Sequence, residues 1–226
     1  MRIVWRTEVP NWIILAGMFL VAAVSWTSAP ERYPVHWNLA GQVDRYGGKT
    51  EGLLLMPVMT LAIYLALVFV PRIDPLRANY ERFRGTYGAM RLVFTVSMAI
   101  IYGIMLLSGA GYPIDTSRVI PMVVGGMLVV VGNFLGKIRP NWFVGIRTPW
   151  TLSSRKSWVK THRLGGWLFI LVGLSLMLTG LVRTVWSFEL MMAVFVASMV
   201  WMIAYSYVVW RSDPDRTTFW NGNREG

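Results

Sequence analysis

The side chains that could carry chemistry together fall within one polar stretch, residues 31–51. It holds His36 and three carboxylates, Glu31, Asp44 and Glu51. A zinc hydrolase needs about three protein ligands and an open coordination position, yet neither His-x-Glu nor His-Glu-x-x-His spacing occurs here. The chain also lacks a Gly-x-Ser-x-Gly elbow, has no cysteine and has only two histidines. We therefore expect no enzyme, no metal site and no cofactor.

The same stretch is better suited to binding a ligand. Its turn-forming residues predict a backbone that folds tightly on itself, namely Pro34, Asn38, Gly41, Asp44, Gly47 and Gly48. We interpret it as an outer ligand-binding loop that presents His36, Trp37, Asp44, Tyr46 and Lys49. In the alternative interpretation, Trp37 and Tyr46 only anchor the loop at the membrane interface and His36 bonds a backbone carbonyl.

A second polar stretch, residues 132–166, carries seven Lys and Arg side chains and no Asp or Glu. Cations mixed with tryptophans favour a membrane surface. Proline and glycine make residues 137–149 non-helical, and Arg147 is suited to bind the carbonyls that these breaks leave free. Ser153 or Ser154 then N-caps a short amphipathic interfacial helix that runs into the next apolar run. Trp158 and His162 lie on one face of this helix.

Both polar stretches lie between long apolar runs. Hydrophobic residues make up 55% of the chain and charged residues only 15%, where a soluble domain carries about 25% charged residues. Six runs approach the roughly 20 residues that cross a bilayer as a helix. They are Asn11–Ala29, Leu53–Val70, Thr86–Ala110, Val119–Gly136, Gly166–Val185 and Phe188–Trp210. None alternates with period two, as barrel strands must. The sequence predicts an all-α polytopic membrane bundle of six transmembrane helices.

The distribution of cations predicts the orientation. Sixteen Lys and Arg lie in segments on one side of the predicted membrane and five on the other, which places both termini in the cytoplasm. The net charge of +11 would suggest nucleic acid in a soluble protein, but cytoplasmic loops account for it here, so no nucleic acid is expected. The basic stretch is expected to bind anionic membrane lipid.

The interior of the runs is almost without charge. Arg91 is expected to reach back to the interface. The lack of Asp, Glu or His near the midpoint of a run disfavours an ion-coupled transporter. Gly132-x-x-x-Gly136, together with Gly125 and Gly126, predicts a small-residue packing face, although glycine is common in membrane helices anyway.

Three pieces of the basic stretch closely resemble the signature of the SdpI family. They are Asn133, the run of residues 137–153, and Trp158 with residues 161–166. The Pro34-x-His36-Trp37 loop with Gly41, Asp44 and Lys49 resembles the N-terminal module that accompanies this signature, and Ile73-Asp74-Pro75 fits it too. Residues 1–85 would then form an N-terminal module with two helices, and residues 86–226 an SdpI-like module with four. The structural or partner-binding residues are expected to be Asn133, Arg139, Asn141, Gly145, Arg147, Thr148, Pro149, Trp150, Thr151, Trp158, Thr161 and His162.

The resemblance implies a bacterial multispan protein of the cytoplasmic (inner) membrane. It implies immunity to a secreted membrane-active peptide, so the expected partner is an antimicrobial peptide or toxin. The alternative is a membrane receptor whose basic stretch recruits a cytoplasmic regulatory protein, with a small-solute transporter less favoured. An oligomer is compatible with the sequence.

Overall fold

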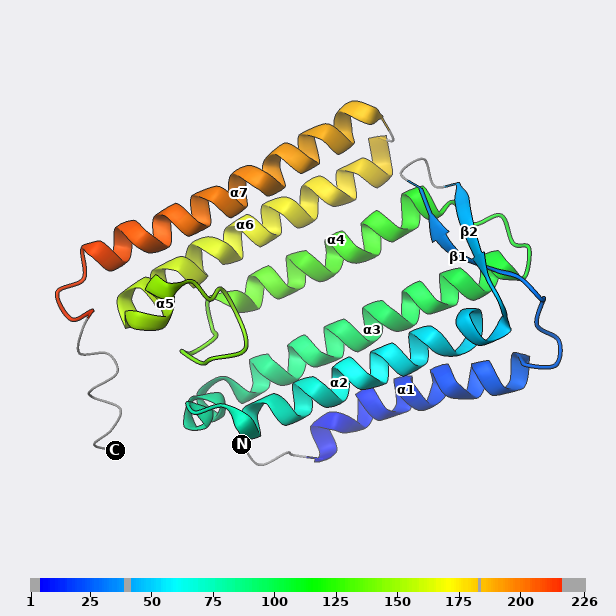
Figure 1. Ribbon diagram of the computed structural model, residues 1–226, viewed down its shortest axis with the longest axis horizontal. Coiled ribbons are helices and arrows are strands. Elements are labelled where there is room, and N and C mark those ends of the chain that lie inside the picture. Colours follow the sequence, from blue (N-terminus) through cyan, green and yellow to red (C-terminus); the bar gives the residue numbers. More distant parts are fainter. Residues whose placement is uncertain (1–4, 39–41, 183, 217–226) are drawn as a thin grey trace.

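The structure, a computed structural model, is a bundle of long helices that run side by side in alternating directions (Figure 1). It describes residues 5–38, 42–182 and 184–216. Within these ranges six helices are long and apolar enough to cross a membrane, as predicted. The elements are α1 (Trp5–Ser25), β1 (Tyr33–Trp37), β2 (Val43–Gly47), a π-helical turn η1 (Glu51–Leu55), α2 (Met56–Ile73), a 3₁₀ helix η2 (Arg77–Phe83), α3 (Arg84–Gly109), α4 (Thr116–Leu135), α5 (Pro149–Ser153), α6 (Arg155–Val182) and α7 (Val185–Arg211).

Two predicted boundaries are wrong in a way that matters for the site. Helix α1 begins at Trp5 rather than Asn11, so Glu8 lies inside a membrane-spanning helix. Helix α6 begins at Arg155 rather than Gly166, because the interfacial helix that was predicted to run into the fifth span continues into it as one helix. Ser154 caps it as predicted, because its Oγ accepts the Ser157 N–H at 2.9 Å. Gly41 of the predicted ligand-binding loop lies outside the described residues, as do three of the cations counted for the orientation, namely Arg2, Arg183 and Arg224.

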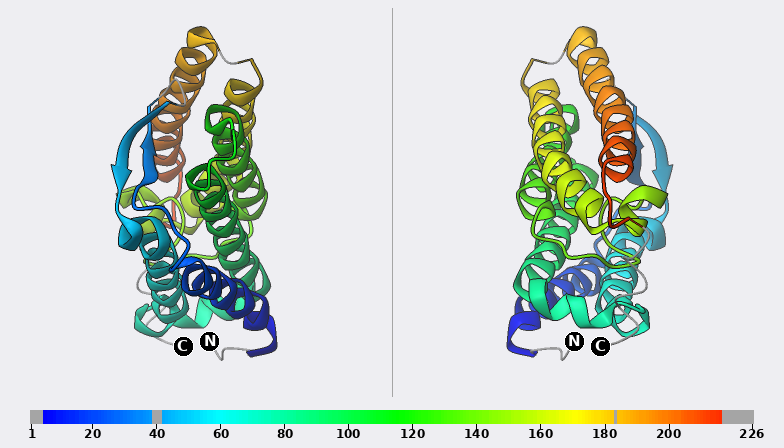
Figure 2. Two further views of the ribbon diagram at one scale, coloured as in Figure 1. Left: turned by 90° about the vertical axis from the view of Figure 1, so that its right-hand side faces the viewer. Right: turned by 90° about the vertical axis from the view of Figure 1, so that its left-hand side faces the viewer.

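The bundle has two distinct ends. At the hairpin end, β1 and β2 form an antiparallel two-stranded sheet, which the all-α prediction did not include. Figure 2 shows these strands along one side of the bundle rather than over its middle. At the α5 end lie α5, the start of α1 and the end of α7 (Figure 1). The start of α1 and the end of α7 lie at the same end of the bundle, as an even number of membrane crossings requires. The side of the membrane on which each end lies stays a prediction.

Helices α4 and α6 pack backbone against backbone. A Cβ on Gly125 would stand 2.5 Å from the Gly173 carbonyl oxygen, and one on Gly132 would stand 2.7 Å from that of Gly166. Both helices repeat glycine every seven residues, which keeps a small-residue seam facing the partner helix. Gly125 and Gly132 form part of this packing face, as predicted. Gly126 does not, because its Cβ would meet nothing within 4 Å.

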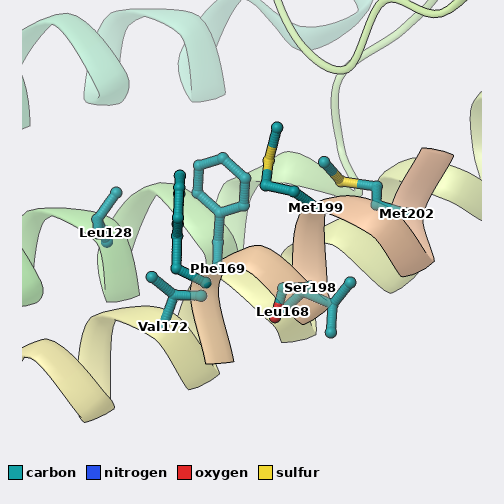
Figure 3. Close-up of a pocket in the computed structure, with 8 residues that line it drawn as sticks. Leu128, Leu168, Phe169, Val172, Ser198, Met199 and Met202 are labelled. Carbon is teal, nitrogen blue, oxygen red and sulfur yellow. The ribbon is translucent and has the colours of Figure 1, made fainter. Parts of the chain in front are cut away.

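A small apolar cavity of about 80 Å³ lies between α4, α6 and α7 (Figure 3). Its lining is apolar apart from Ser198, so it offers little to orient a polar ligand. The lining residues are Leu128, Leu168, Phe169, Val172, Phe195, Ser198, Met199 and Met202.

Candidate functional site

The loop of residues 136–148 at the α5 end is folded around His162 of α6. Gly145 has a φ of +109°, a conformation open to glycine but strained for other residues. A Cβ there would run into the His162 ring. The Ile146 N–H donates to His162 Nε2 at 3.0 Å, and His162 Nδ1 lies 2.8 Å from the Trp158 carbonyl oxygen. Because an amide N–H can only donate, His162 is the neutral tautomer with its proton on Nδ1.

Asn141 closes the first turn of this loop. Its Oδ1 accepts the N–H groups of Phe143 and Val144 at 2.9 and 2.6 Å. Its Nδ2 donates to the carbonyls of Arg139 and Val144, each at 2.9 Å. The side chain is fully buried, so these bonds replace the water that the amide would otherwise need. Asn141 therefore determines the shape of the turn.

The loop is also tied to the other half of the bundle, through the connection between α2 and η2. Asp74 Oδ2 accepts the Trp142 N–H at 2.9 Å and the Tyr80 hydroxyl at 2.9 Å. The same hydroxyl lies 3.2 Å from Asn141 Oδ1, and Asn79 Nδ2 donates to the Pro140 carbonyl at 2.8 Å. The sequence analysis had singled out Asp74 and Asn141 but missed Asn79 and Tyr80. These two could not be found from the sequence, because they contact a segment about sixty residues away.

Helix α5 is a single capped turn that the sequence analysis did not predict. Thr148 has extended backbone, as expected before Pro149, and it forms a capping box with Thr151. Thr148 Oγ1 also donates to Ser206 Oγ of α7 at 3.0 Å. Trp150 packs edge-on against Tyr207 of α7, with ring centroids 5.2 Å apart. These contacts join the loop to the last helix.

The remaining residues of the predicted set differ in their surroundings. Arg147 Nη1 donates to the Trp142 carbonyl at 2.9 Å, the role expected of it. Asn133 and Arg139 have exposed side chains. Trp158 was expected at the membrane surface, but it is fully buried: its Nε1 donates to the Ile138 carbonyl at 2.9 Å. Thr161 is also buried, and its Oγ1 has no partner among the described residues.

A buried ion pair lies within the spans of the other half, and the sequence analysis missed it. Arg91 was expected to reach the interface, yet only 2% of it is exposed. It donates through Nη2 to Glu8 Oε1 and through Nε to Glu8 Oε2 at 3.4 Å. Tyr64 and Asn11 also donate to Glu8 Oε2, at 2.9 and 3.3 Å. Arg91 could have indicated this pair from the sequence, because a charged side chain inside a span usually pairs with an opposite charge there.

The outer hairpin, residues 31–51, is held on the bundle by Tyr33. Only 3% of this side chain is exposed, and its ring lies against Gly52 and Gly109, where any Cβ would collide with it. Burial raises the pKa of the Tyr33 hydroxyl. Trp37 packs onto the cluster of Met18, Tyr102 and Met105. Tyr33 and Trp37 therefore anchor the two ends of β1.

The polar side chains of the outer hairpin face solvent in pairs. His36 Nδ1 lies 2.6 Å from Asp44 Oδ1, with 63% and 42% of the two side chains exposed, so His36 bonds a carboxylate rather than a carbonyl. Lys49 lies 3.2 Å from Glu31. Tyr46 is 57% exposed. The fold therefore brings His36 and Asp44 together, holds Lys49 in a second pair and leaves Trp37 in an anchoring role.

Chemically, the two regions differ. Among the described residues no group of three or more His, Cys, Asp or Glu could hold a metal ion. The α5 end is a network of mostly buried hydrogen bonds that joins the loop of residues 136–148 to α6, α7 and the α2–η2 connection, which suits a structural joint. The outer hairpin offers a donor and acceptor pair on a short two-stranded sheet, which suits recognition of a polar partner.

Two segments of the chain match known protein families. Residues 137–206 match the SdpI/YfhL protein family, and residues 13–61 match a domain of unknown function, DUF1648. The chain is 22% identical over 168 residues to the immunity protein SdpI of Bacillus subtilis, covering 74% of this chain and 78% of that protein. It is 29% identical over 73 residues to an uncharacterized protein of Archaeoglobus fulgidus, covering 32% of this chain and 40% of that protein. No solved structure matches the chain. The segment that matches the SdpI/YfhL family, residues 137–206, thus holds residues 137–148 of the loop around His162, α5, α6 and most of α7.

Proposed function

We propose that this protein confers immunity to a membrane-active antimicrobial peptide or toxin by binding it at the membrane. The observation that carries this proposal is the similarity of 74% of the chain to the immunity protein SdpI. The six apolar helices agree with a protein that works in the cytoplasmic membrane. A bound peptide could then neither insert nor dissipate the membrane potential.

The geometry supports a division of labour between two modules. Residues 1–85 would supply the capture surface, because they contain the outer hairpin with its exposed His36–Asp44 pair. Residues 86–226 would supply the scaffold, because the loop of residues 136–148 is hydrogen-bonded to His162 of α6 and to Ser206 of α7. Asp74 joins the two, since it lies in the first module and accepts the Trp142 N–H of the second.

The test is protection of a sensitive cell. The chain is expressed in a Bacillus subtilis strain that lacks its own SdpI. The cells are exposed to conditioned medium from Bacillus subtilis and, separately, from the organism that carries this chain, with a membrane-potential dye as readout. We expect expressing cells to keep their potential in at least one medium that depolarises the empty-vector control. Equal depolarisation in both media contradicts the proposal.

The capture surface is tested by changing one hairpin group at a time. We expect His36→Ala, Asp44→Asn and Lys49→Ala to leave membrane abundance unchanged, because these side chains lie outside the spans. Losing a charge-assisted hydrogen bond costs about 1.5–3 kcal/mol, or roughly tenfold or more in affinity, so the tolerated dose of medium should fall by that factor. Glu189→Gln is the control: it removes an exposed carboxylate at the hairpin end, on α7. Full protection by all three hairpin variants would place the contact elsewhere.

A second candidate function rests on the cations at the α5 end. Arg139, Arg147, Arg155, Lys160 and Arg163 all have exposed side chains there. Such a surface attracts anionic lipid or an acidic cytoplasmic protein. We expect charge-neutral substitutions of Arg155 and Lys160 to release a recruited regulator from membranes while protection persists. If membranes with the variant bind every soluble protein that membranes with the wild-type protein bind, recruitment through these cations is contradicted.

A further inference from the structure

A groove of about 640 Å³ opens between the hairpin-end parts of α1 and α3, beside β1. Ser25 and Ser28 line it from the end of α1 and the turn that follows, Gly103 and Leu106 line it from α3, and Tyr33 lines it from the outer hairpin. The volume lies within the range of about 300–1,000 Å³ that is typical of ligand pockets. The groove is continuous with the outer hairpin, because Tyr33 both begins β1 and forms part of the groove wall.

The groove combines apolar walls with a negative rim. Helix α1 ends at Ser25 and α3 ends at Gly109, and neither helix has a basic residue in its last turn. The C-terminal end of a helix carries a partial negative charge that stabilises a nearby cation. The described lining residues include no charged side chain. The Ser28 hydroxyl donates to the Ser25 carbonyl at 3.3 Å and the Ala110 N–H donates to the Leu106 carbonyl at 2.9 Å, but no described lining side chain places a cation at either helix end. The Ser25 and Tyr33 hydroxyls add further hydrogen-bonding groups, and the Ser28 oxygen can still accept a hydrogen bond.

We propose that this groove binds a cationic, largely apolar segment of the peptide. Its ammonium or guanidinium group would lie at the two helix ends, and its apolar side chains would lie against Leu106 and the neighbouring wall. A peptide fits better than a lipid acyl chain, because a hydrocarbon cannot use the hydroxyls or the helix ends, whereas amide N–H and cationic groups can. This proposal rests on the proposed immunity function and deepens it by naming the site.

Gly103 allows the groove to be filled without disturbing the fold. A Cβ added there would meet nothing within 4 Å, so Gly103→Leu places its side chain in open space. Gly126→Leu is the matched control, because Gly126 also has nothing within 4 Å of an added Cβ and lies on α4, away from the groove. With the conditioned medium that wild-type protein resists, we expect Gly103→Leu to lower the tolerated dose at least tenfold at equal abundance. Gly126→Leu should protect as wild type does. Full protection by Gly103→Leu overturns the proposal.

A labelling experiment supplies a second readout that does not depend on protection. The chain has no cysteine, so Ser28→Cys introduces a single thiol in the groove and Thr27→Cys, one residue away, introduces an exposed thiol that does not line it. In vesicles, the peptide fraction of that medium should slow maleimide labelling at position 28 at least fivefold and leave position 27 unchanged. An unchanged rate at position 28 contradicts the proposal. So does a thiol that is already shielded without peptide, which would indicate lipid in the groove. If wild-type cells depolarise like the empty-vector control, the immunity function fails instead.

Discussion

Breaking the Glu8–Arg91 pair should destabilise the protein more than replacing both partners. Both side chains are 98% buried, so neither charge has water as an alternative partner. Removing one member of a buried pair typically costs about 3–5 kcal/mol, whereas replacing both is often nearly neutral. Arg91→Met leaves the Glu8 carboxylate with the Tyr64 and Asn11 donors but with no cation to pair with it among the described residues.

The double variant Arg91→Met with Glu8→Gln removes both charges but keeps an oxygen that can accept the Tyr64 hydroxyl. We therefore expect Arg91→Met alone to lower the unfolding free energy by about 3–5 kcal/mol. At roughly 2–4 °C per kcal/mol for a chain of this size, the midpoint should fall by about 6–20 °C. The double variant should recover most of that loss.

The assay is thermal unfolding of purified protein in one detergent, followed by circular dichroism. Arg118→Met is the matched control, because Arg118 is exposed at the start of α4 and surface changes usually stay within about 0.5 kcal/mol. Equal midpoints for the single and double variants would refute the argument, because they would show no coupling between the two charges. A midpoint for Arg91→Met within the range of the control would refute the burial argument as well.

Three further predictions test the packing and the topology. Gly132→Leu should push α4 away from the Gly166 carbonyl and lower the unfolding free energy by at least about 1–3 kcal/mol in the same unfolding assay. Gly126→Leu should not, because a Cβ at Gly126 meets nothing within 4 Å. Equal midpoints for the two variants would contradict the glycine seam. Gly145→Ala should reduce membrane abundance on an immunoblot, because it adds left-handed strain of about 1–2 kcal/mol and a clash with the His162 ring; normal abundance would mean that the loop is less tightly packed than described. A cytoplasm-specific reporter fused after Arg211 should be active, and activity of a periplasm-specific reporter there would reverse the orientation.

Several features could be predicted from the sequence because they depend on neighbouring residues. The six spans follow from the length and hydropathy of each run. The cap at Ser154 and the extended backbone of Thr148 follow from local side-chain chemistry. The run of residues 137–153 carries a family pattern that the comparison confirms.

Other features depend on which faces of the helices meet, and only the tertiary structure decided them. Glu8 and Arg91 are 83 residues apart, and Asp74 and the Trp142 amide are 68 apart. Hydropathy cannot place such pairs, because in a bilayer nearly every face of a span is apolar and the pattern does not show which face turns toward a neighbour. The seven-residue glycine register between α4 and α6 and the groove beside Tyr33 arise in the same way. Composition and local pattern thus determined which segments cross the membrane, whereas the rotation and order of the helices determined which polar groups meet.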